Sequence, residues 1–296
     1  MKLKSAARNV ISTAGRDSSV DDSFEMTGSK SHKFFGKKML KFSVFIFIIS
    51  ISFSNLLLAQ SADELINEGD SLVKSFNNQK ALEKYLEADK ILPSNWEVFW
   101  RVSRAYVDIA EDMPSETSTQ EDAQLAKYQL AFNYADKAVK LAPNESITYL
   151  RRAIANGRIA LFKGVFSVAG VVNKVKDDCE KAIKLGNGGN YFQALAHYVL
   201  GRTHAKVSEK WAPARSVLGL GWGDIDIAIE EYKKAIELKP NFRMFYLDLA
   251  KAYIREDEYD KAREMLNNVT ESPKEDESDE DNLAEAKNLL EAIKDE

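Results

Sequence analysis

The stretch "AIEEYKKAIELKPNF", residues 228–242, decides the fold of this 296-residue chain. Its apolar residues recur every three or four positions, the period of an amphipathic helix, and Pro240 ends the pattern. Proline ends a helix because it lacks an amide hydrogen and restricts the residue before it. Three other stretches end in a similar way, which indicates an internal repeat: "ALEKYLEADKILPSN" (81–95), "AFNYADKAVKLAPNE" (131–145) and "VKDDCEKAIKLGNGG" (175–189).

The spacing of small and aromatic residues sets the repeat length. Small residues let two antiparallel helices approach closely, and an aromatic residue fills the space between neighbouring units. In a frame of about 34 residues that starts at Ala62, the marker residues are Gly69, Ala81, Tyr85, Ala88 and Pro93. This pattern resembles the tetratricopeptide repeat (TPR). The resemblance implies an all-α, right-handed solenoid of stacked helix pairs.

The repeats predict about five helix pairs over residues 61–270, with insertions in the second, third and fourth. The insertion "WAPARSVLGLGWGD" (211–224) separates the two helices of the fourth repeat. It carries neither the phosphate-binding G-x-x-x-x-G-K-[ST] motif nor a dinucleotide-binding G-x-G-x-x-G motif in a βαβ setting. Residues 271–281, with seven acids and one lysine, predict a solvated linker. Residues 282–296 predict a helix that caps the stack.

The order of the insertions resembles one TPR subgroup, the regulator of microtubule dynamics proteins and their bacterial relatives. Three stretches carry the resemblance: "WRVSRAYVDIAED" (100–112), "AIANGRIALFKG" (153–164) and "HYVLGRTHAKVSEKWAPARSVLGLGWGDIDIAIEEYKKAIELKPNF" (197–242). The "GLGWG" within the last stretch departs from the Gly- and Pro-containing turn expected there. The resemblance implies a helical scaffold and says little about its ligand.

The N-terminal part of the sequence predicts a targeting segment rather than a folded domain. Residues 1–38 are polar, and Met39 would start an export signal better than Met1 does. Residues 39–60 predict a signal peptide, in which lysines precede an apolar run and small residues allow cleavage near Ala59. The alternative is an uncleaved membrane anchor formed by residues 42–59, which is just long enough to span a bilayer. We expect the body to be exported, into the periplasm of a bacterium, or held at the membrane by this anchor.

Charge and composition exclude several function classes. Residues 1–60 carry a net charge of +5, which leaves −10 for residues 61–296 out of −5 for the whole chain. An acidic body predicts no nucleic-acid binding, because such binding needs cations against phosphates. Cys179 is the single cysteine, so no intrachain disulfide or cysteine-based zinc site can form, and its place in the repeat predicts inert core.

Neither a metal site nor a catalytic centre is indicated. His197 and His204 lie two turns apart on one expected helix, too far apart to share a metal. No nucleophile, base and orienting acid stand in a recognisable arrangement. We therefore expect no cofactor, no metal, no catalytic residues and no enzymatic activity.

Cationic residues recur where the first helices of the repeats are expected to face the groove. The TPR resemblance implies that position 9 of these helices lines the concave side, and that position holds Asp70, Arg104, Ile154, Arg202 and Lys251. Trp100, Arg101, Arg151, Arg158 and Lys206 are close in sequence. We expect a partly basic groove that binds a protein or peptide, in particular an acidic one, with Arg104 and Arg202 as the main pair. The alternative is that these arginines pair with acids inside the solenoid.

The insertion adds Trp211, Arg215 and Trp222 as candidate partner contacts, since tryptophan is common at binding hot spots. It could fold over the groove as a lid, or both indoles could pack onto the outside of the fourth and fifth repeats. The asparagines of the carboxylate clamp in chaperone-binding TPR domains do not align here. The apolar run 158–175 predicts a buried helix, with a membrane-surface or pocket role as its alternative.

These observations predict a non-enzymatic scaffold on the extracytoplasmic side that binds a protein or peptide in its concave groove. The alternative is a small-molecule binding component that delivers its ligand to a transporter. A closed apolar pocket lined by Phe162, Phe166, Trp211 and Trp222 would favour the carrier, and an open channel would favour the scaffold. A self-associating assembly subunit is a third interpretation.

Overall fold

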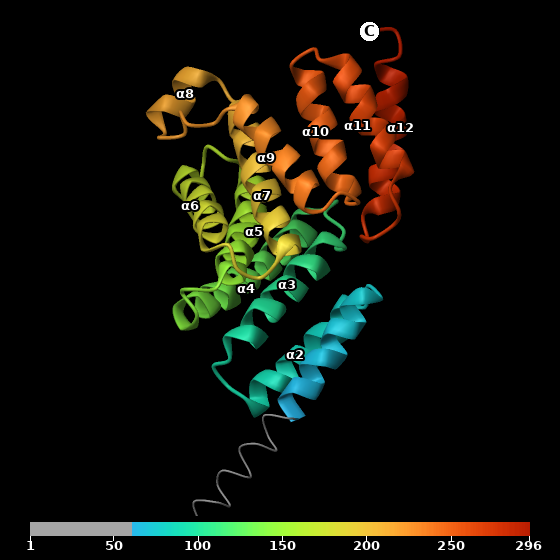
Figure 1. Ribbon diagram of the computed structural model, residues 1–296. Coiled ribbons are helices and arrows are strands. Elements are labelled where there is room, and N and C mark those ends of the chain that lie inside the picture. Colours follow the sequence, from blue (N-terminus) through green and yellow to red (C-terminus); the bar gives the residue numbers. More distant parts are fainter. Residues whose placement is uncertain (1–60) are drawn as a thin grey trace, which may run out of the picture. The chain divides into compact units, whose positions relative to one another are not determined.

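The computed structural model describes residues 61–296, which form a stack of helices (Figure 1). The predicted polar extension (1–38) and the predicted signal peptide or anchor (39–60) lie outside the described residues. Over residues 61–296 the chain contains no strand. In the same part of the chain, no helix combines the length and apolar character that a bilayer crossing requires.

The helices pair in chain order. Residues 61–74 are helical and precede α2 (Asn78–Ile91). The next pairs are α3 (Trp96–Glu111) with α4 (Ser118–Leu141), α5 (Ser146–Lys163) with α6 (Ala169–Leu185), α7 (Asn190–Ser208) with α9 (Ile225–Leu238), and α10 (Arg243–Arg255) with α11 (Tyr259–Glu271). The short α8 (Ala212–Val217) lies between α7 and α9, and α12 (Asp279–Ala292) packs against α10 and α11 (Figure 1). The predicted right-handed TPR solenoid of about five helix pairs, with insertions and a capping helix, is confirmed.

The small and aromatic residues of the repeat form the contacts between paired helices. Ala81 and Ala88 of α2 are fully buried, and the ring of Tyr85 between them lies over Gly69. A methyl group on Gly69 would stand 2.4 Å from that ring, so only glycine allows this approach. Ala228 and Ala235 of α9 are buried in the same way. The repeat pattern is therefore a pattern of close helix contacts.

The insertions mostly lengthen helices. In the second repeat, α4 is 24 residues long and begins at a capping box in which Thr117 and Gln120 satisfy each other's backbone amides. In the third repeat, α5 and α6 are 18 and 17 residues long. Gly186 then ends α6 in the left-handed conformation that glycine adopts at low cost. The turn between α5 and α6 packs against the insertion of the fourth repeat, because Val165 and Leu220 belong to one buried cluster.

Most residues of the C-terminal acidic segment, 271–281, are exposed, and hydrogen bonds order the segment. The last helix begins at Asp279, three residues before the expected start at 282. Its first turn is acidic, which suits the positive end of a helix. The Asp279 carboxylate also accepts hydrogen bonds from the backbone amides of Glu275 and Asp276. The acidic residues therefore form an ordered turn against the solenoid.

Candidate partner-binding groove

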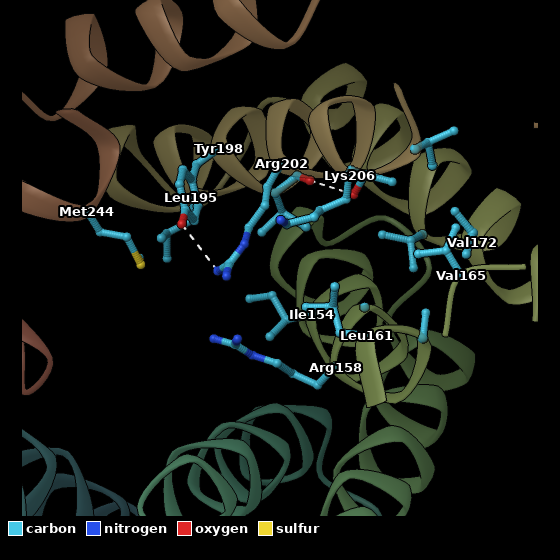
Figure 2. Close-up of a pocket in the computed structure, with 16 residues that line it drawn as sticks. Ile154, Arg158, Leu161, Val165, Val172, Leu195, Tyr198, Arg202, Lys206 and Met244 are labelled. Atoms are coloured by element: carbon cyan, nitrogen blue, oxygen red, sulfur yellow. Dashed lines mark hydrogen bonds between the residues drawn. The ribbon is translucent and has the colours of Figure 1, made fainter. Parts of the chain in front are cut away.

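Two hollows open between the first helices of the pairs. The smaller, which we call the apolar pocket, has a volume of about 130 Å³ and lies between α5, α6 and α7, with Met244 of α10 at one end (Figure 2). Its walls are formed by aliphatic side chains such as Ile154, Leu161, Val172 and Leu195. The larger, which we call the clasped groove, measures about 680 Å³ and lies between residues 61–74, α3, the start of α7 and residues 275–281.

The predicted groove cations have acidic neighbours. Three of them form close ion pairs: Arg101 with Asp70 at 2.9 Å, Arg104 with Asp108 at 3.2 Å, and Arg158 with Glu111 at 2.6 Å. Lys251 lies 2.8 Å from Glu285 of the capping helix. This is the pairing that we gave as the alternative interpretation. The groove side of the solenoid is therefore lined by both charges, and the clasped groove carries more acids than bases.

Unlike Arg101, Arg104 and Arg158, Arg202 forms no close ion pair. Its Nη1 donates to the hydroxyl of Tyr198 at 3.3 Å, and Tyr198 in turn donates to Asp248 at 2.7 Å. The Nε of Arg202 is buried, stays 3.8 Å from Asp248 and has no hydrogen-bond partner. Burial raises the pKa of Tyr198, so its hydroxyl keeps its proton. Figure 2 shows Arg202 and Arg158 extending toward one another beside the apolar pocket.

The acidic turn closes the clasped groove on its open side. We call residues 272–278 the clasp. Arg243 holds the base of the clasp by donating to the carbonyl of Ser272 at 3.0 and 2.7 Å, and Lys239 pairs with Glu275. At the tip, the amide of Asn78 donates to Glu277 at 2.9 Å. The clasp thus joins the first repeat to the C-terminal end of the stack.

Arg151 is a buried residue that sequence reasoning gave only as a neighbour of other candidates. Its side chain is 6% exposed, and its Nε and Nη2 have no hydrogen-bond partner. Burial, and then repulsion by Arg104, lower the pKa of Arg151 to about 10. The next residue, Arg152, instead forms ion pairs with Asp136 and Asp178. Sequence alone does not distinguish the two, because only the packing shows which arginine lacks an acid.

The insertion of the fourth repeat packs on α6 and α7 through some of its residues only. Trp222 donates its indole N–H to Asn173 at 2.8 Å and lies edge-on to His204. Leu220 is fully buried, and Arg215 donates to the carbonyl of Gly223. Trp211, by contrast, is 74% exposed. The expectation that both indoles pack onto the fourth and fifth repeats therefore fails for Trp211, and Trp222 packs against the third and fourth.

The aromatic residues expected to close a carrier pocket do not come together. Phe166 and Trp211 are exposed, and none of the four residues named for that pocket lines the apolar pocket. The Nδ1 of His197 donates to the carboxylate of Glu231 on α9 at 2.6 Å. Within residues 61–296 no group of three or more His, Cys, Asp or Glu side chains is placed to hold a metal ion.

Comparison with known proteins places the chain in a family. Residues 59–294 match the family model for regulator of microtubule dynamics protein 1-3. Regulator of microtubule dynamics protein 3 of Rattus norvegicus is 26% identical over 224 residues, which are 73% of this chain and 44% of that protein. Regulator of microtubule dynamics protein 2 of Bos taurus is 25% identical over 239 residues, 78% of this chain and 56% of that protein. The chain spans about half the length of these curated relatives.

A solved structure agrees with the fold. A thermophilic TPR protein of Thermus thermophilus has a TM-score of 0.53 and 17% sequence identity, and the match covers 77% of this chain and 98% of that one. At this identity the likeness shows the fold alone. The match to the family model, by contrast, extends over most of the chain, and the chain belongs to the regulator of microtubule dynamics protein 1-3 family.

Proposed function

We propose that the chain is a non-enzymatic scaffold that binds a segment of a protein partner between the first helices of its repeats. The TPR fold supports this proposal, since such solenoids present extended curved surfaces. One observation carries it: Arg202 lines an apolar pocket, and its Nε is buried there without a hydrogen-bond partner. A carboxylate of the partner would complete the hydrogen bonding of Arg202, and a neighbouring apolar side chain would fill the pocket.

The energetics favour a partner segment that carries both a carboxylate and an apolar side chain. Hydrogen bonds to charged groups contribute about 1.5–3 kcal/mol each, and burying an aliphatic side chain contributes about 1.5–3 kcal/mol. Ile154, Leu195 and Met244 provide the apolar contacts. Arg158, which faces Arg202 across the pocket (Figure 2), would fix the register of the carboxylate. We therefore infer a partner segment in which an acidic residue adjoins an apolar one.

A photo-crosslinking residue at Leu161, which is 41% exposed at the edge of the apolar pocket, would test this proposal in the full chain. We expect a crosslinked protein whose attached peptide contains an acidic residue beside an apolar one. Arg202→Met should abolish the crosslink. Arg263→Met is the matched control, because Arg263 lies on α11 and pairs with Asp260 away from both hollows. A crosslink that persists in Arg202→Met, or that attaches to no protein, would contradict the proposal.

A second candidate follows from the same pocket. An apolar cavity of about 130 Å³ with Arg158, Arg202 and Lys206 on its lining also suits a small ligand that has an apolar part and an anionic group. Such a ligand would make the chain a carrier that delivers it to a transporter. Native mass spectrometry of the purified full chain would separate the two functions, since only the carrier should retain a bound small molecule that is lost in Arg202→Met.

We also propose that the body acts outside the cytoplasm. The proposal rests on the lysine-flanked apolar run within residues 39–60. N-terminal sequencing of the protein from a cell-envelope fraction would test it. A mature N-terminus near residue 60 would identify a signal peptide, and an intact N-terminus in the membrane fraction would identify an anchor. Recovery of the whole chain from the soluble cytoplasm would contradict both.

A further inference from the structure

The lining of the clasped groove carries more negative charge than the chain itself neutralises. Eight carboxylates line the groove against three cationic side chains, which are Lys74, Arg101 and Arg104. Four of the carboxylates form ion pairs with a lysine or an arginine of the chain. Among residues 61–296 the other four have no cation within ion-pair distance, and these are Asp112, Asp276, Glu277 and Asp281.

The four unpaired carboxylates are accessible and come from separate elements. Asp112 caps the C-terminus of α3, and Asp281 lies in the first turn of α12. Asp276 and Glu277 belong to the clasp, where Glu277 accepts a hydrogen bond only from the neutral amide of Asn78. Asp276 is half-buried, and the other three are exposed. A ligand that met all four would therefore need several cations spaced along the groove.

The end of α3 is unfavourably charged in the free chain. Its last turn contains no basic residue, although the C-terminal end of a helix favours cations. The protein around Asp108 and Glu111 limits their hydration and raises the pKa of both carboxyls, and repulsion by Asp276 of the clasp raises it further. A cation held between α3 and the clasp would relieve this repulsion.

An aromatic surface lines the same groove. Four of its rings form a continuous run, in which neighbouring centroids are 5.9, 5.3 and 6.3 Å apart. They are Trp100, Phe192, Tyr191 and Phe242. One cation of the chain already binds here, since the guanidinium of Arg101 lies 4.2 Å from the Trp100 ring and donates to the carboxylate of Asp70. Arg101 thus shows how the groove holds a cation between an aromatic face and a carboxylate.

We propose that the clasped groove binds a segment of a protein partner in which lysine or arginine residues alternate with apolar ones. Its cations would pair with the four unpaired carboxylates, and its apolar side chains would pack on the aromatic run. A volume of about 680 Å³ accommodates several side chains. This inference goes beyond the proposed function, because it concerns the other hollow and a segment of opposite charge, and neither site depends on the other.

A cationic peptide would test the site in the full chain. The probe is KFKFKFKF, labelled with tetramethylrhodamine and followed by fluorescence anisotropy. In about 0.15 M salt the Debye length is about 8 Å, so distant acids of the body attract the probe little. We expect the native chain to bind it. Asp112→Asn/Asp276→Asn/Glu277→Gln, which we call the groove variant, should bind it at least about tenfold more weakly, which corresponds to about 1.4 kcal/mol.

The control variant makes the same change in net charge outside the groove. Glu121, Asp122 and Glu264 are exposed and do not line it, so Glu121→Gln/Asp122→Asn/Glu264→Gln should keep the affinity of the native chain. Equal affinity in the two triple variants would overturn the proposal, as would the absence of binding to the native chain. Displacement of the peptide by an equal concentration of spermine would also overturn it, because a polyamine would then be the occupant.

An acidic peptide, EFEFEFEF, separates this site from the proposed function. Binding of this peptide should be lost in Arg202→Met and kept in the groove variant, whereas binding of KFKFKFKF should show the reverse. If the cationic peptide alone failed to bind, this site would fall and the proposed function would stand. If the acidic peptide alone failed to bind, this site would stand without the anchor at Arg202.

Thermal unfolding shows whether the carboxylates serve a ligand or the fold. The groove variant should keep or raise the Tm of the free chain, because it removes repulsion between α3 and the clasp. KFKFKFKF should raise the Tm of the native chain but not that of the groove variant. A groove variant that unfolds at a much lower temperature than the native chain would contradict the proposal, because the carboxylates would then be structural.

Discussion

Gly201 and Tyr232 touch where α7 crosses α9. A methyl group on Gly201 would stand 3.1 Å from Cδ1 of Tyr232 and 3.0 Å from the carbonyl oxygen of Ala228. Gly201→Ala should therefore push the two helices apart and lower the free energy of unfolding by about 1–3 kcal/mol. Urea denaturation of the full chain would measure this loss.

Gly157 on α5 provides the matched control for Gly201. It lies within a helix as well, but a methyl group there would meet no atom within 4 Å. Gly157→Ala should raise the free energy of unfolding by up to about 1 kcal/mol, since alanine is the better helix former. A loss in both variants would show that the close approach at Gly201 is not the cause.

The insertion should divide into a structural part and an exposed part. Leu220→Ala removes a fully buried side chain between α6 and α7 and should cost about 2–5 kcal/mol of unfolding free energy. Trp211→Ala removes an exposed indole and should change stability by less than about 0.5 kcal/mol. Thermal unfolding of both variants, followed by circular dichroism, would check the contrast. A large loss in Trp211→Ala would mean that the indole packs.

Cys179 should be unreactive in the folded chain. It is completely buried between α5, α6 and α7, and burial raises the pKa of its thiol well above the usual value. We expect negligible labelling by a disulfide reagent at pH 8 and rapid labelling once denaturant unfolds the chain. The unfolded chain is the internal control, and fast labelling without denaturant would contradict the burial of Cys179.

The clasp should lose stability as the pH rises. Burial, and then repulsion by Asp112 and Asp108, raise the pKa of Glu277 above its usual value. A carboxyl with a raised pKa holds its proton more tightly in the folded state, so its contribution to stability is greatest at low pH. That contribution falls as the pH rises through about 4.3 and beyond.

Glu277→Gln should therefore flatten the dependence of stability on pH and stabilise the chain at pH 7 relative to the native sequence. Guanidinium denaturation at pH 5 and pH 7 would show the difference. Glu264→Gln is the control, because Glu264 is exposed on α11, outside the clasped groove. An identical pH dependence in native and Glu277→Gln chains would contradict repulsion at the clasp.

The repeat and its helix pairs could be predicted from sequence because they depend on local spacing. Ala81, Tyr85 and Ala88 show their role through separation alone, and the structure buries all three. The partners of the arginines could not be predicted in the same way. Arg151 and Arg152 are adjacent, yet one faces Trp100 while the other faces Asp178 on α6. The direction of each side chain depends on the packing of α5, which the repeat pattern does not specify at single-residue resolution.

The conformation of the clasp could not be predicted from sequence either, because it depends on contacts with residues far away in the chain. The acidic composition of residues 271–281 predicted exposure, because charge runs usually stay solvated. Most of these residues are exposed in the structure, but Arg243 also holds the turn by donating to the carbonyls of Ser272 and Asp279. Composition describes the average environment of a segment, whereas these contacts depend on where the fifth helix pair places one arginine.

The contact between Asn78 and Glu277 can form only after all the repeats between them have folded. The two residues are separated by 199 positions in the chain, and most contacts of a solenoid join neighbouring repeats. Their meeting therefore requires every repeat between them to be in place. Until then, no contact offsets the entropy cost of closing so long a loop. A chain that has lost its C-terminal residues keeps the α3 side of the clasped groove but lacks Asp276 and Glu277, which line its other side.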